Sequence, residues 1–196
     1  AYGRVLELGG GQGWASCIYK RLFPHTHVTA TDISPFAIES LAKWQTVFDV
    51  ELDNSYACKS YEIQEESASV DIIFCFASAH HFLAHRKTIS EISRVLKPGG
   101  KAIYLNEPTS PALFYPYAVW KINRSRPDVP EDVLVISRLK RIAHQESLGM
   151  LVDYHPPTIK RGPYRLIHVV SVVRDSTPFL QRIMPSTANI MFNKAE

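Results

Sequence analysis

The strongest constraint on the fold of this chain is residues 5–13, where a short apolar run meets an acidic residue and then breaks into glycines. The apolar run predicts a strand, and residues 14–23 predict a helix because Trp14, Ile18 and Leu22 recur every four positions. The glycines between them allow backbone conformations that other residues avoid, and the free N–H groups at the start of the helix point at whatever lies above the turn. This order of elements indicates a nucleotide-type binding site.

Two common glycine-rich nucleotide motifs do not fit this stretch. The dinucleotide-binding motif requires glycines at relative positions one, three and six. The sixth position is Trp14 when counted from Gly9, and Ser16 when counted from Gly11. A phosphate-binding P-loop requires a lysine directly after its last glycine, whereas Gly13 is followed by Trp14. The spacing therefore disfavours both a nicotinamide oxidoreductase and a P-loop enzyme.

The elements that follow alternate between strand and helix. Residues 28–31 predict a second strand that closes on Asp32. Ser34 and Pro35 then open a helix as N-cap and first-turn proline, and its apolar stripe continues to Phe48. This alternation predicts a parallel sheet with right-handed crossovers. At the carboxyl end of the second strand, the carboxylate of Asp32 can accept both hydroxyls of a ribose; the alternative is a surface aspartate before a helix.

Two separated motifs of this chain resemble those of a known family. The first is the acidic-x-Gly-x-Gly-x-Gly pattern of Glu7, Gly9, Gly11 and Gly13. The second is Arg-Val-Leu-Lys-Pro-Gly-Gly at residues 94–100, about ninety residues further along. Both motifs, at this separation, resemble those of class I S-adenosylmethionine (SAM) dependent methyltransferases. The joint match is far more specific than either part, and it implies SAM as the cofactor.

The resemblance implies cofactor-binding residues near the carboxyl ends of four strands. In that family the glycine turn holds the methionine part of SAM and the acidic residue after the second strand binds the ribose. An acidic residue after the third strand often binds the adenine, but none occurs here before Glu62, so we expect backbone contacts near Ser60 instead. The implied cofactor-binding residues are Glu7, Gly9, Gly10, Gly11, Gly13, Asp32, Ile33, Ser60, Phe76 and Ala77.

Two histidines are the candidate catalytic residues. They follow residues 70–77, an almost unbroken apolar run that predicts a strand buried on both faces. Imidazole titrates near neutral pH, so either His81 or His80 can take a proton from an acceptor. Glu107 and Tyr104, near the end of the fifth strand, are reserve candidates. The alternative is that the histidines only support the structure or pack against the cofactor. No metal-ligand spacing occurs, so no metal is expected.

The remaining elements complete the predicted sheet. We expect strands at residues 56–60, 102–105, 150–154 and 189–194, a helix that ends before the turn at residues 97–100, and a second helix at residues 131–148. Residues 163–184 suit either a helix or a strand, and we favour a helix. Residues 108–130 form an insertion whose aromatic segment, Phe114–Trp120, is either a lid or substrate-pocket wall or a packed extension of the core.

These elements predict one α/β domain with a doubly wound, mostly parallel seven-stranded sheet, an antiparallel last strand and helices on both faces. At 196 residues the chain is long enough for one such domain and too short for two. Residues 1–107 form the cofactor-binding half, residues 108–130 the insertion and residues 131–196 the C-terminal helix and strands. Because the first strand begins only about four residues into a chain that starts without Met, we expect a fragment or a processed chain.

Composition narrows the partners and the location. A formal charge of +3 is too small to imply a nucleic-acid partner. Three cysteines without a CxxC spacing indicate reduced thiols and therefore a cytoplasmic protein. No signal peptide and no apolar run of membrane-spanning length occurs. The sequence leaves the oligomeric state open.

The sequence therefore predicts a SAM-dependent methyltransferase that acts on a small molecule. Residues 124–134 are loosely similar to insertions in methyltransferases found with glycan and polyketide genes, which favours a sugar or lipid-linked hydroxyl as the acceptor. The alternative is a SAM-binding domain that has lost transfer activity and serves as a scaffold or sensor.

Overall fold

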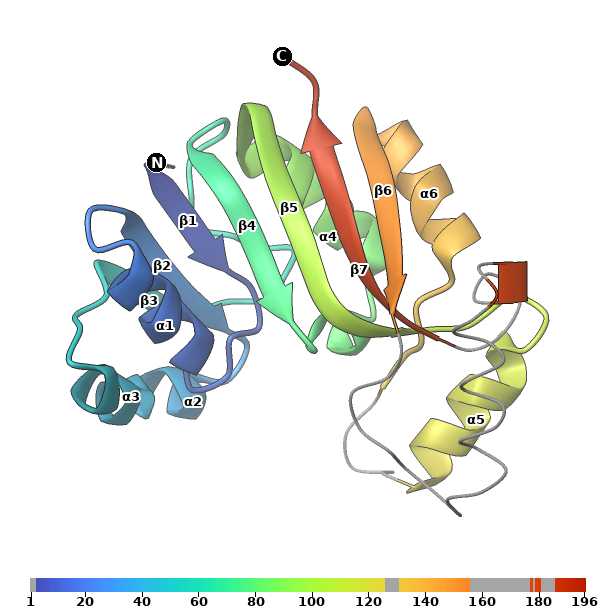
Figure 1. Ribbon diagram of the computed structural model, residues 1–196, viewed down its shortest axis with the longest axis horizontal. Helices are drawn as coiled ribbons and strands as arrows, with labels where there is room; N and C mark the ends of the chain where they lie inside the picture. Colours follow the sequence, from blue (N-terminus) through green and yellow to red (C-terminus); the bar gives the residue numbers. More distant parts are fainter. Residues whose placement is uncertain (1–2, 126–130, 156–176, 178, 181–185) are drawn as a thin grey trace.

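Seven strands form one sheet in the computed structural model, which describes residues 3–125, 131–155, 177, 179–180 and 186–196. The strands are β1 (Arg4–Glu7), β2 (His27–Asp32), β3 (Asn54–Ala57), β4 (Val70–Phe76), β5 (Leu96–Thr109), β6 (Leu148–His155) and β7 (Ser186–Lys194). Their order across the sheet is β3-β2-β1-β4-β5-β7-β6. The pairs from β3 to β5 are parallel, and β7 runs antiparallel between β5 and β6 (Figure 1). The predicted mostly parallel sheet with an antiparallel last strand is confirmed.

Helices cover both faces of the sheet (Figure 1). They are α1 (Trp14–Leu22), α2 (Pro35–Glu39), α3 (Leu41–Phe48), α4 (His85–Val95), α5 (Tyr115–Ser125) and α6 (Ile136–Gln145), with a short 3-10 helix, η1 (Ala79–His81). The first three helices lie on one face, α4 and α6 lie on the other, and α5 extends beyond the carboxyl edge of the sheet. None of the helices within the described residues is both long and apolar enough to cross a bilayer.

Alternating side chains of the central strands join the sheet to both helical layers. Val5 of β1 and Ile72 of β4 belong to the cluster that packs against α1. The next residue of each strand, Leu6 and Ile73, is fully buried in the larger cluster with α4 and α6. Both faces of the central strands are therefore buried, which explains why β4 is an almost unbroken apolar run.

A bulge in β5 turns its carboxyl end toward the α4 face. Between Tyr104 and Glu107 the pairing with β7 shifts, so that two residues of β5 lie opposite Asn189 alone. Asn106 adopts a left-handed conformation with a φ of 57°, and its N–H donates to Asn189 Oδ1 at 2.9 Å. Side chains alternate along a regular strand, so Tyr104 and Glu107 would otherwise face opposite sides of the sheet. With the bulge, both lie on the side of Cys75, which shares a core cluster with Tyr104 and whose Sγ lies 3.8 Å from Glu107 Oε1.

Two predicted elements are divided or shifted. The helix expected from Ser34 to Phe48 is divided at Ser40, whose hydroxyl donates to Ala37 O at 2.7 Å. Such a bond competes with the helical N–H groups for the carbonyl and favours a break. The third strand, expected at residues 56–60, ends at Ala57 because it pairs with β2 only as far as Asp32.

Two further limits differ because of pairing with β5. The helix expected from residue 131 begins only at Ile136, since Leu134 N donates to Pro108 O at 3.0 Å and keeps this segment extended. The turn expected at residues 97–100 falls inside β5, which begins at Leu96. At these residues the register between β4 and β5 shifts. The sixth and seventh strands are confirmed. The helix favoured at residues 163–184 lies outside the described residues, except for positions 177, 179 and 180.

Candidate functional site

The carboxyl ends of β1 to β4 meet around a cavity of about 440 Å³. The residues that line it are Leu8, Gly9, Thr31, Asp32, Ile33, Cys58, Lys59, Ser60, Tyr61, Ser78, His81, Phe82, Leu83 and Ala84. A cavity of this size at the point where the strand order of a parallel sheet reverses is typical of a ligand site. The predicted site residues that line it are Gly9, Asp32, Ile33, Ser60 and His81.

The glycine turn after β1 uses conformations that favour glycine. Gly9, Gly11 and Gly13 have φ values of 65°, 56° and 74°, in the left-handed region that other residues rarely adopt. Gly13 is also the N-cap of α1. A Cβ added at Gly13 would lie 2.2 Å from Leu41 Cδ1, so the turn packs directly against α3.

Glu7 supports the turn from beneath and does not line the cavity. Its side chain is 2% exposed and accepts hydrogen bonds from Ser16 N at 3.1 Å and from Ser16 Oγ. A Cβ added at Gly10 would lie 2.7 Å from Glu7 Cδ. Burial raises the pKa of Glu7 to about 7, although the Ser16 hydrogen bonds act in the opposite direction. The acidic residue of the motif therefore ties the turn to the first turn of α1.

Asp32 joins the glycine turn to the next helix. Its Oδ2 accepts from Gly11 N and its Oδ1 from Ser34 N, both at 2.8 Å. Ser34 caps α2 by accepting from Ala37 N, as predicted. Because the carboxylate of Asp32 is only partly buried and lines the cavity, its remaining lone pairs can accept the hydroxyls of a ribose.

Residues 58–61 form the wall of the cavity next to Asp32. Cys58 N donates to Asp32 O at 2.8 Å, which joins this segment to the end of β2. The hydroxyl of Ser60 lies 2.8 Å from Thr88 Oγ1 of α4. The Ser60 hydroxyl is therefore already bound to α4, which leaves the backbone of this segment to contact the adenine. That contact stays a prediction.

Phe76 and Ala77 do not belong to the cavity lining. Phe76 is 40% exposed, and its ring packs edge-on against Trp14 with the ring centres 5.3 Å apart. Ala77 has a φ of 47°, a strained conformation for a residue with a Cβ, at the point where β4 ends. Contact of these two residues with the cofactor stays a prediction.

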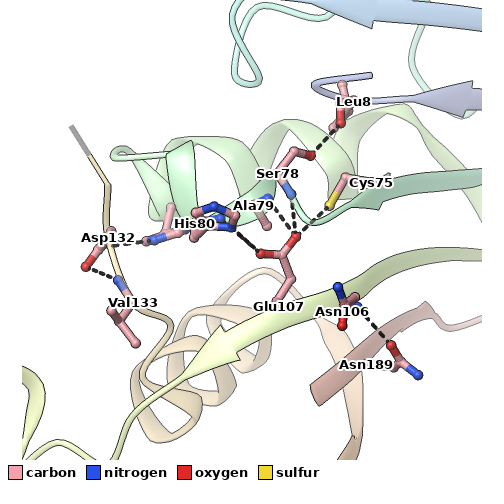
Figure 2. A network of polar contacts seen from close by, with 11 residues as sticks. Leu8, Cys75, Ser78, Ala79, His80, Asn106, Glu107, Asp132, Val133 and Asn189 are labelled. Atoms are coloured by element: carbon pink, nitrogen blue, oxygen red, sulfur yellow. Dashed lines mark hydrogen bonds and ion pairs between the residues drawn. The ribbon is translucent and has the colours of Figure 1, made fainter. Parts of the chain in front are cut away.

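The buried carboxylate of Glu107 holds the loop after β4 (Figure 2). Glu107 is 0% exposed. Its Oε1 accepts from Ser78 N and Ala79 N, both at 2.8 Å, and its Oε2 accepts from His80 N at 3.2 Å. His80 Nδ1 lies 2.9 Å from the same Oε2. Four N–H groups around one carboxylate fix the path of this loop, so the geometry suits Glu107 for positioning better than for the reserve role of a base.

The two histidines differ in what they contact. A carboxylate only accepts hydrogen bonds, so in its contact with Glu107 the Nδ1 of His80 carries the proton, which leaves Nε2 as the acceptor of the neutral ring. His81 is exposed and lines the cavity, and its ring centre lies 4.2 Å from that of His80. Tyr104, the other reserve candidate, is 1% exposed, and burial raises its pKa well above the usual range. Of these candidates, His81 is the one that faces the cavity.

Comparison with known families decides what kind of site this is. A family described as "Methyltransferase domain" matches residues 6–104, which include the glycine turn, Asp32 and both histidines. The chain belongs to this family. It is a class I SAM-dependent methyltransferase domain, as the two sequence motifs predict, and its cofactor is S-adenosylmethionine.

Curated relatives agree with this assignment. The domain is 32% identical over 101 residues to malonyl-[acyl-carrier protein] O-methyltransferase of Hahella chejuensis, covering 50% of this chain and 34% of the relative. It is 31% identical over 124 residues to the uncharacterized methyltransferase YcgJ of Bacillus subtilis, covering 56% of this chain and 44% of the relative. The matched region thus spans less than half the length of either relative.

Solved structures share the fold. The crystal structure of YcgJ matches with a TM-score of 0.74 at 19% identity, covering 100% of this chain and 93% of that chain. Geranyl diphosphate C-methyltransferase of Streptomyces coelicolor matches with a TM-score of 0.75 at 14% identity, covering 98% and 73%. At these identities the likeness extends to the Rossmann-like fold alone.

The cavity of the methyltransferase domain has the features that SAM requires. A Cβ added at Gly9 would lie 3.0 Å from Ser78 Oγ and 3.1 Å from the Phe82 ring, so glycine lets the turn pack closely against this part of the cavity wall. The carboxylate of Asp32 supplies an acceptor for ribose hydroxyls, and the side chains of Phe82 and Leu83 supply an apolar wall. The residues present therefore fit the nucleoside part of SAM.

Sequence reasoning missed part of this site. Lys59, Tyr61 and residues 82–84 line the cavity, and all of them follow the ends of β3 or β4. Their position just past a strand end was the signal that could have found them, since ligands of parallel sheets bind there. The positioning role of Glu107 had no such signal, because it depends on the bulge in β5.

Proposed function

We propose that this domain transfers the methyl group of SAM to an oxygen atom of a small-molecule acceptor that enters beside His81. The observation that carries the proposal is that Gly9 of the glycine turn, Asp32 and His81 line the same cavity at the carboxyl edge of the sheet. The relative from Hahella chejuensis is named as an O-methyltransferase, which supports an oxygen acceptor. Sugar and lipid-linked hydroxyls remain the acceptor classes that the proposal favours.

The residues of the chain divide the work of binding and transfer. Bound SAM supplies an already electrophilic methyl group, so alignment of the acceptor is the main task of the protein. Asp32 accepts the ribose hydroxyls, and Gly9 places the backbone of the glycine turn in the wall of the cavity, beside which the methionine tail lies. The side chains of Phe82 and Leu83 keep water away from the cofactor. An unprotonated ring nitrogen of His81 takes the proton of the acceptor hydroxyl.

His80 serves the same step indirectly. Its Nδ1–H donates to Glu107 and its ring packs against that of His81, so it limits the directions in which His81 can point.

A cytoplasmic location belongs to the same proposal, because all three cysteines, Cys17, Cys58 and Cys75, are free thiols.

Calorimetry on the purified domain tests the cofactor assignment. SAM and S-adenosylhomocysteine should bind with micromolar-range affinity, whereas NADH should not bind. Asp32→Ala should weaken SAM binding by about 2 to 3 kcal/mol, because it removes the acceptor of charge-assisted hydrogen bonds. The exposed Glu39→Ala in neighbouring α2 is the matched control and should leave the affinity unchanged. Binding of NADH without any response to SAM would overturn the proposal.

Release of S-adenosylhomocysteine in the presence of candidate hydroxyl acceptors tests the base. With an accepted substrate, His81→Ala should slow transfer by roughly 10²- to 10⁴-fold and change its pH profile, while SAM affinity should barely move. His80→Ala should have the smaller effect. If both variants keep normal rates from about pH 6 to 9, catalysis rests on alignment alone and neither histidine is a base.

A further inference from the structure

A second cavity, of about 920 Å³, lies beside the cofactor cavity. It is bounded by the start of α4, by α5, by residues 131–132 and by α6. Leu83 and Ala84 line both cavities, so the two share a wall at the loop after β4. The two cavities therefore adjoin at this loop.

One face of the aromatic helix α5 closes the second cavity. Tyr115 and Val119 line it, whereas Tyr117 and Trp120 do not belong to its lining and are 61% and 55% exposed. The insertion that the sequence marks as a lid or pocket wall thus contributes a wall, but through Tyr115 rather than through its most exposed rings.

Positive charge predominates around this cavity. Arg86 and Lys87 stand in the first turn of α4, and Arg138 and Arg141 stand one turn apart on α6. All four side chains belong to exposed residues. The carboxylates among the described lining residues are those of residues 131–132. Four cations therefore face two anions.

One of these two carboxylates is already committed to the protein. Asp132 Oδ1 accepts from Val133 N at 2.7 Å, and Asp132 Oδ2 lies 3.3 Å from Nε2 of the buried His85. Although burial acts in the opposite direction, these contacts hold the pKa of Asp132 below its usual range. The two hydrogen bonds hold this carboxylate in place beside His85.

The arrangement of the cations is unfavourable in the absence of an anion. The first turn of α4 has no acidic residue, and no side-chain cap precedes it, so the positive end of this helix adds to the charge of Arg86 and Lys87. Arg138 and Arg141 are three residues apart on α6, a spacing at which like charges repel. Within the described residues, no ion pair engages either of these arginines.

We propose that the second cavity binds an anionic group of the methyl acceptor, a phosphate or a carboxylate, between Arg138 and Arg141 of α6 and the first turn of α4. The planar guanidinium groups of arginine match both kinds of anion through paired N–H donors. This inference rests on the proposed function, since it takes the occupant to be the acceptor. It makes the acceptor a small molecule with an acidic end that lies away from the sugar or lipid-linked hydroxyl that is methylated.

Titration of the ¹⁵N-labelled domain with inorganic phosphate, and separately with acetate, at low ionic strength tests the proposal by NMR. We expect saturable shifts of the amides of residues 86–88 and 138–141 with at least one of the two anions. The tighter anion identifies the acidic group of the acceptor. The Arg138→Gln, Arg141→Gln double variant should weaken this binding by about tenfold or more, because it removes two charge-assisted partners.

Lys140→Gln is the matched control, because Lys140 is an exposed cation of the same helix that does not line this cavity. It should leave anion binding unchanged. No saturable shift with either anion, or equal weakening by Lys140→Gln, would overturn the inference. The affinity for SAM is measured in the same samples of the unchanged domain. If the unchanged domain binds SAM but neither anion, this inference alone is refuted; if it binds an anion but not SAM, the proposed function is refuted.

Discussion

Replacing Glu107 by glutamine should destabilise the domain through the loop that carries both histidines. A glutamine has nearly the same shape, but it offers one acceptor oxygen and one NH₂ group in place of two acceptor oxygens. If its oxygen keeps the bonds from Ser78 N and Ala79 N, its NH₂ group meets the N–H of His80, which then has no acceptor. The ring of His80 can adapt by reversing its tautomer, but its backbone N–H cannot.

The magnitude follows from these contacts. A buried donor without a partner costs about 1 to 3 kcal/mol, and each of the two remaining bonds loses roughly 1 kcal/mol when the acceptor is no longer charged. Removal of a buried charge offsets part of this loss, because the carboxylate of Glu107 must be desolvated in the native state. We therefore expect Glu107→Gln to lower the free energy of unfolding by about 2 to 4 kcal/mol.

Urea unfolding followed by circular dichroism measures this difference. Glu62→Gln is the control, because Glu62 is exposed and its carboxylate bonds only Lys59 within the described residues, so its stability should stay close to that of the unchanged domain. The ¹⁵N shifts of His80 give a second readout, with the proton on Nδ1 in the unchanged domain and on Nε2 in the variant. A loss smaller than about 0.5 kcal/mol, the usual range of surface substitutions, would refute the reasoning.

Two further predictions concern the glycine turn. The pKa of Glu7 is raised from 4.5 to about 7 in the native state, so the associated stability is present below about pH 4.5 and is lost as the pH rises through 7. Glu7→Gln cannot ionise, so between pH 5 and pH 8 its free energy of unfolding should rise by about 2.5 kcal/mol relative to that of the unchanged domain; parallel pH curves would contradict this. Gly13→Ala should lower the melting temperature much more than Gly11→Ala. Both glycines have a positive φ, but only at Gly13 would the added Cβ meet Leu41. Equal losses in melting temperature would show that backbone strain alone causes the destabilisation.

Local sequence was enough to predict the cofactor half of the domain. Positions with a positive φ in the first turn carry glycine, and the cap of α2 is supplied by Ser34 directly before Pro35. Asp32 ends its strand, so its place at the carboxyl edge of the sheet could be deduced from residues 28–32 alone. Each of these features depends on neighbours within a few positions along the chain, which is why residue pattern and spacing identify them.

Contacts between distant segments decided the rest. Leu134 is extended because it pairs with Thr109 and its N–H donates to Pro108 O, and this long-range pairing shortens a helix whose apolar pattern begins earlier. The breadth of the second cavity likewise depends on how α5 and α6 meet the start of α4. No periodicity within one segment carries information about such pairings, because their free energy comes from residues that are far apart in the sequence.

Glu107 shows the difference most clearly. From the sequence alone it is a carboxylate at the end of a strand, and the alternation of side chains would place it on the opposite face from Tyr104. The bulge opposite Asn189 reverses that placement and brings Glu107 under the loop of the two histidines (Figure 2). A bulge forms where two strands pair out of step, so the role of this residue exists only once β7 has docked against β5.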